Sequence, residues 1–386
     1  MHRRALLVLL LCGGLICAWA GASGNRAAAL AIAADDDERA QTALADDGAD
    51  RAADDGADRL APSPQGLGGI QAEDGQVAAP PPAPTVTGGE VIQARQRLVI
   101  SGAGDTNLDP NYIPAFRTEG YGYAFTGLQD LFATDDLTVV NLECAASPLG
   151  AKVPKEFNFN CDPAALPVMK AAGVEVANLA NNHSGDYGPA ALVDTRANVA
   201  AAGLAPVGVG RDVTEAEAPA LFTVKGWKIA VLGFGGVIPD PSWVAGPDRP
   251  GMADGDTTER MVAAVKRAKA QADLVVVAIH WGVELDTTPR ADDVERAKAM
   301  IDAGADMIFG HHSHRLNPLE TVAGKPVAWG LGNFVWPRLS DAGAKTAVAQ
   351  VIVEPDGTMT SCLVPTFIER NGHPVVQVPY QGDCRW

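Results

Sequence analysis

The chain has 386 residues, with 47 acidic and 30 Lys or Arg side chains, and a formal net charge of -17. Its length allows one or two domains. The acidic balance, without any block of basic residues, argues against nucleic acid as a partner, because phosphate backbones are bound by clustered Lys and Arg. An anionic polymer stays open as a substrate, since a bound metal ion can reverse the local field.

The N-terminus has the pattern of an export signal. MHRR is followed by an uncharged apolar stretch from Ala5 to Ala22, in which Ala18-Trp19-Ala20 offers a cleavage site. We therefore predict a signal peptide over residues 1–20 and an exported, secreted or cell-envelope protein. The apolar stretch is also just long enough to cross a membrane, so a retained signal anchor is the alternative.

Residues 21–95 consist mainly of Ala, Asp, Gly and Pro, and include the doubled unit ADDGADRA, ADDGADRL and the run PPPAP. Such a composition offers too little apolar surface to offset the entropy of ordering. We predict a disordered linker there, one domain over residues 96–370, and a C-terminal tail over residues 371–386.

Four cysteines remain once the predicted signal peptide is removed: Cys144, Cys161, Cys362 and Cys384. In an exported protein they are expected to form disulfides. Three pairings are open to four cysteines. Proximity favours Cys144 with Cys161 and Cys362 with Cys384, and the second pair would tether the C-terminal tail.

Strand-like and helix-like stretches alternate along the domain, which predicts an α/β fold with largely parallel sheets. The expected strands are Leu98–Ile100, Leu137–Val140, Val174–Leu179, Lys228–Phe234, Leu274–Ile279 and Met307–Phe309. The expected helices are Thr126–Ala133, Pro163–Ala172, Gly188–Ala202, one capped at Asp256–Glu259 and one capped at Asp292–Glu295. Later runs at Val327–Trp329, Ala347–Glu354 and Ser361–Phe367 predict an antiparallel edge or a second sheet. The Pro- and Gly-rich loop over residues 238–256 predicts a rim or lid beside the site.

Polar side chains follow the expected strands one after another. They are Asp105, Glu143, Asn182 with His183, His280, and His312 with His314. Because sites in α/β sheets lie at the carboxyl ends of strands, we expect these residues to meet. Carboxylate, amide and imidazole ligands suit Mn, Fe, Zn or Co, as one ion or two.

Each of these residues also has an ordinary structural interpretation. Asp105 stands in a Gly-rich turn, a single histidine is more often a packed core residue, and His183 could merely bond the turn that follows it. If the chain stays extended past Phe309, His312 and His314 point to one side and His311 to the other.

The motifs in order resemble the bacterial capsule synthesis protein family of the CapA type, which is associated with poly-gamma-glutamate. The resemblance covers about Leu98 to Phe334. It rests on GDTNL from 104, VVNLE from 139, ANLANNHSGDYG from 177, HWGVE from 280, DAGADMIFGHHSHRLNPLE from 302 and LGNFVW from 331. That family is similar to calcineurin-like metallophosphoesterases, which implies a four-layer α/β/β/α sandwich.

The resemblance implies a role for individual residues. Asn182 becomes a metal ligand and His183 the general acid, while His280, His312 and His314 take the later ligand positions. The usual D-x-H is here Asp105-Thr106-Asn107, and the second acidic motif is Asn141-Leu142-Glu143. This loss of a histidine makes a single metal ion an open alternative to two. We expect a further group of residues to support the ligands or contact the substrate: Asn107, Asn141, Asn181, Asp186, Glu284, His311 and Asn333.

These expectations combine into a metal-dependent hydrolase-like site in capsule or cell-surface polymer metabolism. The partners would be an anionic cell-surface polymer or its precursor and membrane synthase subunits. A polymer-binding or assembly subunit that keeps the fold without turnover is the alternative. A nucleotidase would need an aromatic clamp for the base, and no such pair stands out.

Overall fold

The computed structural model of the protein describes residues 94–385. The predicted signal peptide and nearly all of the predicted linker lie outside these residues. Within the part of the chain that the structure describes, no helix combines the length and apolar character needed to cross a membrane.

The first sheet contains the first strand of the domain at its centre. Its order is β16-β15-β14-β1-β2-β3-β4, and β13 pairs with β1 beyond the end of β14. Strands β1 to β4 are parallel, whereas β14, β15 and β16 run antiparallel to their neighbours. The bounds are β1 Leu98–Thr106, β2 Leu137–Leu142, β3 Val176–Asn178, β4 Ala205–Val207, β13 Asn333–Val335, β14 Lys345–Val353, β15 Met359–Arg370 and β16 His373–Val376.

The second sheet has the order β11-β12-β10-β9-β7-β6 and is parallel from β7 through β12. Its bounds are β6 Ala220–Val224, β7 Trp227–Gly235, β9 Leu274–His280, β10 Met307–His311, β11 Leu319–Val322 and β12 Lys325–Ala328. A small ribbon joins β5 Val209–Gly210 to β8 Gly251–Met252. Strand β9 is buried along its whole length, as expected for a parallel strand covered on both faces.

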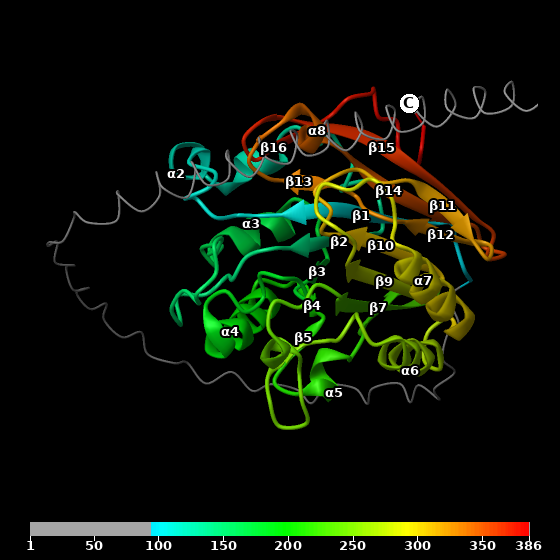
Figure 1. Cartoon of the computed structure of the whole chain (residues 1–386). Coiled ribbons are helices and arrows are strands. Elements are labelled where there is room, and N and C mark those ends of the chain that lie inside the picture. Colours follow the sequence, from blue (N-terminus) through cyan, green and yellow to red (C-terminus); the bar gives the residue numbers. More distant parts are fainter. Residues whose placement is uncertain (1–93, 386) are drawn as a thin grey trace, which may run out of the picture.

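The helices cover the outer faces of the two sheets (Figure 1). One group packs with the first sheet: α2 Ala115–Glu119, the 3-10 helix η1 Tyr121–Phe125, α3 Ala165–Ala171 and α4 Gly188–Ala201. The other packs with the second sheet: α5 Val213–Ala216, α6 Thr258–Lys269 and α7 Ala291–Ala303. Two short elements remain, the 3-10 helix η2 Pro241–Trp243 and α8 Asp341–Ala344.

Three apolar cores define the layers. The central core joins the inner faces of the sheets, for example Ile100 and Val139 of the first with Val276 and Phe309 of the second. The two outer cores lie between each sheet and its helices. The chain is therefore a four-layer α/β/β/α sandwich, and this part of the sequence prediction is confirmed.

Local predictions were less accurate. The expected helix at Thr126–Ala133 is wrong: these residues form turns after η1. Gln129 has φ 53°, a left-handed backbone that ends any helix there. By contrast, the prediction for the strand around Val327 is confirmed: this strand, β12, pairs antiparallel with the edge strand β11 of the second sheet and parallel with β10 on its other side.

Both predicted helix caps are also wrong. α6 and α7 begin at Thr258 and Ala291 without a side-chain cap. Asp254 instead accepts hydrogen bonds from the Asp256 and Thr257 amides just before α6.

Disulfides join Cys144 to Cys161 and Cys362 to Cys384, the pairs favoured by proximity. The second holds the end of the chain beside β15. The Asp383 carboxylate also pairs with Arg97 at 2.7 Å. The residues after β15 are thus tied to the first sheet by β16, by this disulfide and by an ion pair.

We predict that Asp135→Asn stabilises the protein at pH 8. Burial raises the pKa of the Asp135 carboxyl to about 7, despite hydrogen bonds from Ser101 and Thr138 that lower it. The unfolded chain loses this proton near the ordinary pKa, so stability falls as the pH rises from about 4 to about 7 and stays low above it.

Thermal melts should therefore show the gain of Asp135→Asn growing from pH 4 to pH 8, to at least about 2 °C. Asp130→Asn, at an exposed carboxylate nearby, is the matched control and should change little at either pH. An equal effect of Asp135→Asn at both pH values would contradict this account.

Candidate metal centre

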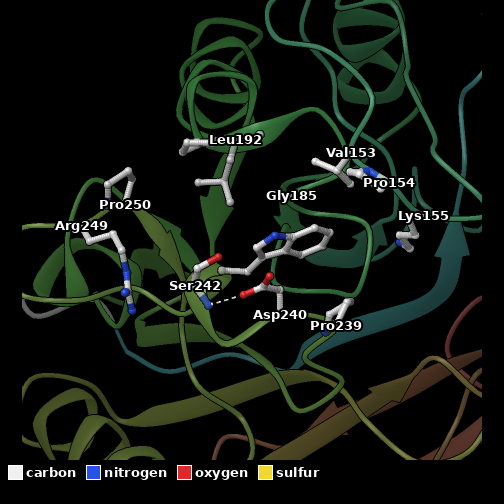
Figure 2. A pocket seen from close by; sticks show the side chains of 13 residues that line it. Val153, Pro154, Lys155, Gly185, Leu192, Pro239, Asp240, Ser242, Arg249 and Pro250 are labelled. Carbon is white, nitrogen blue, oxygen red and sulfur yellow. Dashed lines mark hydrogen bonds between the residues drawn. The ribbon is translucent and has the colours of Figure 1, made fainter.

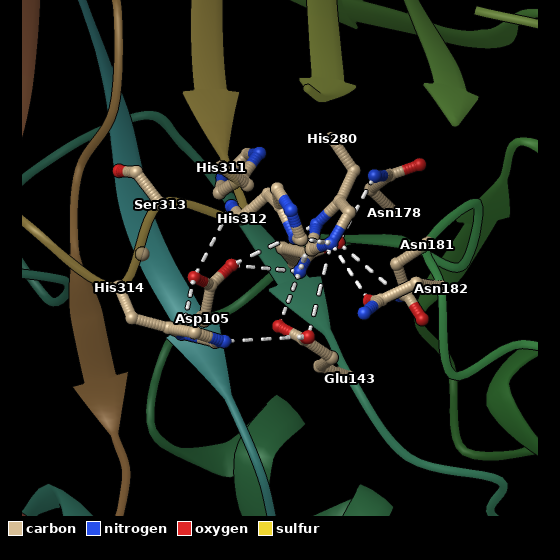
Figure 3. Close-up of polar contacts among 12 residues, drawn as sticks. Asp105, Glu143, Asn178, Asn181, Asn182, His280, His311, His312, Ser313 and His314 are labelled. Carbon is tan, nitrogen blue, oxygen red and sulfur yellow. Dashed lines mark hydrogen bonds and ion pairs between the residues drawn. The ribbon is translucent and has the colours of Figure 1, made fainter. Parts of the chain in front are cut away.

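Strand pairing brings the candidate ligands to one place. In the first sheet, Asp105 pairs in register with Asn141, and Asn141 with Asn178. In the second, His280 at the end of β9 pairs with His311 at the end of β10. The carboxyl ends of the parallel strands of both sheets meet here, so residues far apart in the sequence face one another (Figure 3).

The centre of the cluster is formed by Asp105, Glu143 and His280, which are all fully buried. One possible ligand atom from each lies within 4.8 Å of the others. His280 Nδ1 is 4.0 Å from Asp105 Oδ1, and His280 Nε2 is 3.8 Å from Glu143 Oε1. These separations are too long for direct hydrogen bonds.

Glu143 has one carboxylate oxygen without a hydrogen-bond partner. Asn141 Nδ2 donates to Oε2 at 3.2 Å, but Oε1 receives no donor. The Nε2 atoms of three histidines surround Oε1, His280 at 3.8 Å and His183 and His314 both at 3.9 Å. A buried carboxylate oxygen with no donor is costly, and the space around it has nitrogen ligands on three sides.

Four further contacts join the remaining candidate ligands to this cluster. His280 Nε2 lies 2.9 Å from Asn182 Oδ1 and 3.1 Å from His312 Nδ1. His314 Nδ1 lies 3.2 Å from Asp105 Oδ2 and 2.8 Å from Asn333 Oδ1. All six sequence-predicted ligands are therefore brought together: Asp105, Glu143, Asn182, His280, His312 and His314.

The pKa values of the two carboxyl groups are shifted in opposite directions. Burial raises the pKa of Asp105, but the hydrogen bond and charge of His314, with His280 and His311, lower it further, so the net shift is downward. Burial raises the pKa of Glu143 well above its ordinary value, and the Asp105 charge adds to this. Glu143 therefore lacks the positive partner that Asp105 has.

The imidazoles are mostly neutral. Burial lowers the pKa of His280 well below its ordinary value, and His312 adds to this effect. Burial and His314 lower the pKa of His312 to about 4. At His314 burial is outweighed by the hydrogen bond to Asp105, which raises its pKa. Neutral imidazole is the form that binds metals.

This donor set fits a divalent metal ion. It offers carboxylate, amide and imidazole atoms, it is buried, and the unpaired Glu143 oxygen requires a positive partner. Both cysteines nearest to it in sequence, Cys144 and Cys161, are bonded to each other. The ligand chemistry is thus the O/N mixture expected from the sequence.

The prediction of an extended HxH was wrong in its geometry. β10 ends at His311, while His312 and His314 have φ 93° and φ 50°. Alternation along a strand therefore does not aim these rings. They come together because the backbone curls around Asp105, whose Oδ2 accepts the His312 amide at 3.3 Å.

Asparagines hold the carboxylates in place. Asn141 Nδ2 donates to Asp105 Oδ1 at 2.8 Å, and Asn141 Oδ1 accepts from Asn178 and Asn181 at 3.1 and 3.3 Å. Asn141 and Asn181 thus lie where the sequence analysis expected supporting residues, as does Asn333 beside His314. Asn178 was not predicted, although a polar residue inside an apolar strand could have indicated it.

Three expected supporting residues make no side-chain hydrogen bond to the candidate ligands. Asn107 Oδ1 accepts from the Asp109 amide, His311 Nε2 lies 3.1 Å from the Ala103 carbonyl, and Glu284 is exposed. Glu284 acts only through its charge on the buried groups. Asn107 occupies the position at which the D-x-H pattern has a histidine, and its side-chain oxygen is hydrogen-bonded within its own loop.

His183 is held by a carboxylate. Its Nδ1 lies 2.6 Å from Asp186 Oδ2, and its ring stacks on Phe159 with centroids 4.0 Å apart. Nε2 therefore faces Glu143. Burial lowers the pKa of His183, although Asp186 opposes the shift. His183 thus bonds Asp186 within its own turn through Nδ1 and also points Nε2 toward the candidate metal centre.

Lys155 also belongs to this network, and no sequence pattern indicated it. Its ammonium group lies 2.8 Å from Asp186 Oδ1, 3.1 Å from His183 Nδ1 and 2.6 Å from the Asn182 carbonyl. It stands on the loop between the Cys144–Cys161 disulfide partners, far in sequence from β3.

Comparisons with known proteins place the sequence in a family. The sequence model of the bacterial capsule synthesis protein PGA_cap matches residues 99–338. The PGA biosynthesis protein CapA of Bacillus subtilis is 33% identical over 293 residues, covering 74% of each chain. The capsule biosynthesis protein CapA of Bacillus anthracis is 30% identical over 289 residues, covering 71% of this chain and 68% of that protein.

A third relative matches a shorter part of the chain. A probable polyglutamine synthesis accessory protein of Mycobacterium tuberculosis is 35% identical over 211 residues, covering 52% of this chain and 55% of that protein. The chain belongs to the bacterial capsule synthesis protein family.

Among solved structures, a 5'-nucleotidase from Candida albicans covers 70% of this chain and 52% of its own, with TM-score 0.41 and 11% identity. The sulfate thiohydrolase SoxB of Thermus thermophilus covers 70% and 57%, with TM-score 0.40 and 13% identity. These superpositions are partial, and the layer order above follows from the sheets and cores of this chain.

We predict that His280→Gln lowers bound metal by at least roughly tenfold, because it removes the imidazole closest to Glu143 and Asn182 together. Elemental analysis of the purified full chain measures this. His373→Gln is the matched control, since His373 lies at the far end of the first sheet beside Tyr123. Unchanged metal in a folded His280→Gln protein would show that these residues do not hold the ion.

Proposed function

We propose that this protein is an exported, metal-dependent hydrolase of the cell envelope that acts on an anionic surface polymer or its precursor during capsule synthesis. Family membership supplies the setting. The single observation that carries the catalytic part is Glu143 Oε1, a buried oxygen without a donor that faces three imidazole nitrogens.

One ion of Mn, Fe, Zn or Co suits the ligands best. Asp105, Glu143, Asn182 and His280 would hold it, with His312 and His314 beside them. Such an ion, when bound, lowers the pKa of a coordinated water and offsets charge on a phosphoryl or carbonyl oxygen. A single ion is favoured over two because Asn107 has its side-chain oxygen on its own loop.

His183 supplies the proton chemistry. Asp186 holds Nδ1, so Nε2 is the nitrogen free to exchange a proton with a reacting oxygen. Because its pKa lies below the ordinary value, the imidazole is neutral near pH 7 and first accepts a proton, which it can then donate to a leaving group. Phe159 covers one ring face and limits its rotation.

The relatives named for capsule and polyglutamine synthesis support a polymer as substrate. The two disulfides support an oxidising compartment, and hence export. Membrane synthase subunits that make the polymer are the expected partners. Nucleic acid does not fit a chain with net charge -17 and no basic block.

His183→Gln should leave metal content and melting temperature nearly unchanged and cut turnover at least roughly a hundredfold, the lower end for general acid–base catalysis. The assay is hydrolysis of bis(p-nitrophenyl) phosphate by metal-loaded protein, with His373→Gln as the matched control.

Full turnover by His183→Gln would show that the proton transfer is misassigned. Wild-type protein that holds the metal without hydrolysing phosphodiester, amide or ester probes would favour a polymer-binding or assembly subunit over an enzyme.

A further inference from the structure

A cavity of about 580 Å³ lies beside the candidate metal centre (Figure 2). Its walls come from three segments, residues 153–155, residues 185–192 at the start of α4, and residues 239–250 of the loop predicted as a rim. Lys155 belongs both to this wall and to the network of His183. The volume is in the range of small-molecule sites.

The aromatic surface of the cavity is Trp243. Its ring packs on Gly185, where an added Cβ would lie 2.5 Å from Trp243 Cδ2, so a side chain at Gly185 would displace the indole. The other four tryptophans among residues 94–385, at 227, 281, 329 and 336, are only 2–3% exposed. Trp243 is half-buried: it packs against the outer core of the first sheet, its ring centroid lies 5.6 Å from the Lys155 ammonium, and it lines the cavity.

The remaining walls combine proline rings with a few polar groups. Asp240, Ser242 and Arg249 all line the cavity, and Figure 2 places Lys155 and Arg249 on opposite sides of it. Asp240 Oδ1 accepts the Ser242 amide at 2.8 Å, and Arg249 donates through Nε and Nη2 to the Val244 carbonyl. The Asp240 carboxylate and the Arg249 guanidinium can each form further hydrogen bonds.

The charged side chains around the cavity are two cations and two anions, Lys155 and Arg249 with Asp186 and Asp240. Lys155 is paired with Asp186 at 2.8 Å, which leaves the Asp240 carboxylate and the Arg249 guanidinium as the open charges. Hydrogen bonds from Ser242 hold the pKa of Asp240 below its ordinary value, so this carboxylate is ionised at neutral pH. The two open charges are of opposite sign, so a polyanion would be attracted by Arg249 and repelled by Asp240, whereas an uncharged polyhydroxyl ligand could bond both groups.

We propose that this cavity is a sugar subsite, in which a pyranose ring of a neutral glycan stacks on Trp243 while its hydroxyls bond Asp240 and Arg249. A pyranose has one apolar face for an aromatic platform and a rim of donors and acceptors. A nucleobase would be sandwiched best between two aromatic rings, and Trp243 is the only aromatic residue among those that line the cavity.

The cavity lies beside His183, because Lys155 contacts both. A role of this subsite in hydrolysis therefore rests on the proposed function. An uncharged sugar unit of the anionic polymer or of its precursor, held here, would present a neighbouring bond or substituent to the metal centre. The binding itself depends on none of the proposed metal ligands, so it should survive treatment of the protein with a chelator.

Titration of the full chain with tetramers of N-acetylglucosamine and of glucose tests the subsite. Calorimetry gives the affinity, and the tryptophan fluorescence should change because Trp243 is partly exposed. Trp243→Ala should weaken binding roughly tenfold, the effect of one stacking contact, and Trp243→Phe should retain part of it. Leu221→Ala removes an apolar side chain that is 55% exposed on β6 and is the matched control.

Three results would overturn the inference. The first is that neither tetramer binds the wild-type chain. The second is that folded Trp243→Ala binds a tetramer as tightly as the wild-type chain does. The third is that an oligomer of glutamate binds in a Trp243-dependent way while both sugars do not. A wild-type chain that binds sugar but hydrolyses none of the probes would refute only the proposed function. A wild-type chain that hydrolyses a probe but binds neither sugar would refute only the subsite.

Discussion

The structure depends on one electrostatic problem, the buried carboxylate of Glu143. Burying a charged carboxylate costs several kcal/mol unless a partner replaces the water, and this cost raises the pKa of Glu143 well above its ordinary value. Asn141 satisfies one oxygen and nothing satisfies the other. Two of the imidazoles around it are each held by a partner on their own far side, Asp186 for His183 and Asn333 for His314. Such an arrangement fits a divalent metal ion at its centre.

The two sheets make this arrangement rigid. Asp105 and Glu143 come from the first sheet and His280 from the second, so neither sheet alone forms the centre. The core between the sheets sets their separation. The Cys144–Cys161 disulfide directly follows Glu143, and the Phe159 amide, two residues before Cys161, donates to Asp186 at 2.8 Å. Packing, covalent linkage and hydrogen bonding therefore fix the positions of these side chains.

Much of this centre could be predicted because it follows from strand ends. Apolar runs such as Leu274–Ile279 locate buried parallel strands, and the polar residues after them must share an edge. The orientation of His312 and His314 could not be predicted, since positive φ angles in non-glycine residues depend on the tertiary contacts around Asp105. Lys155 and Trp243 were missed because loops carry no periodic pattern, and only the fold brings them beside His183.

Anomalous X-ray diffraction from crystals grown with Mn²⁺ or Zn²⁺ tests the central claim most directly, because it locates an ion without assuming its ligands. The account predicts one strong peak within about 2.3 Å of Glu143 Oε1 and of an imidazole nitrogen of His280, the range of metal–ligand bonds. No peak at the centre, or a peak elsewhere while Glu143 Oε1 stays without a partner, would contradict it.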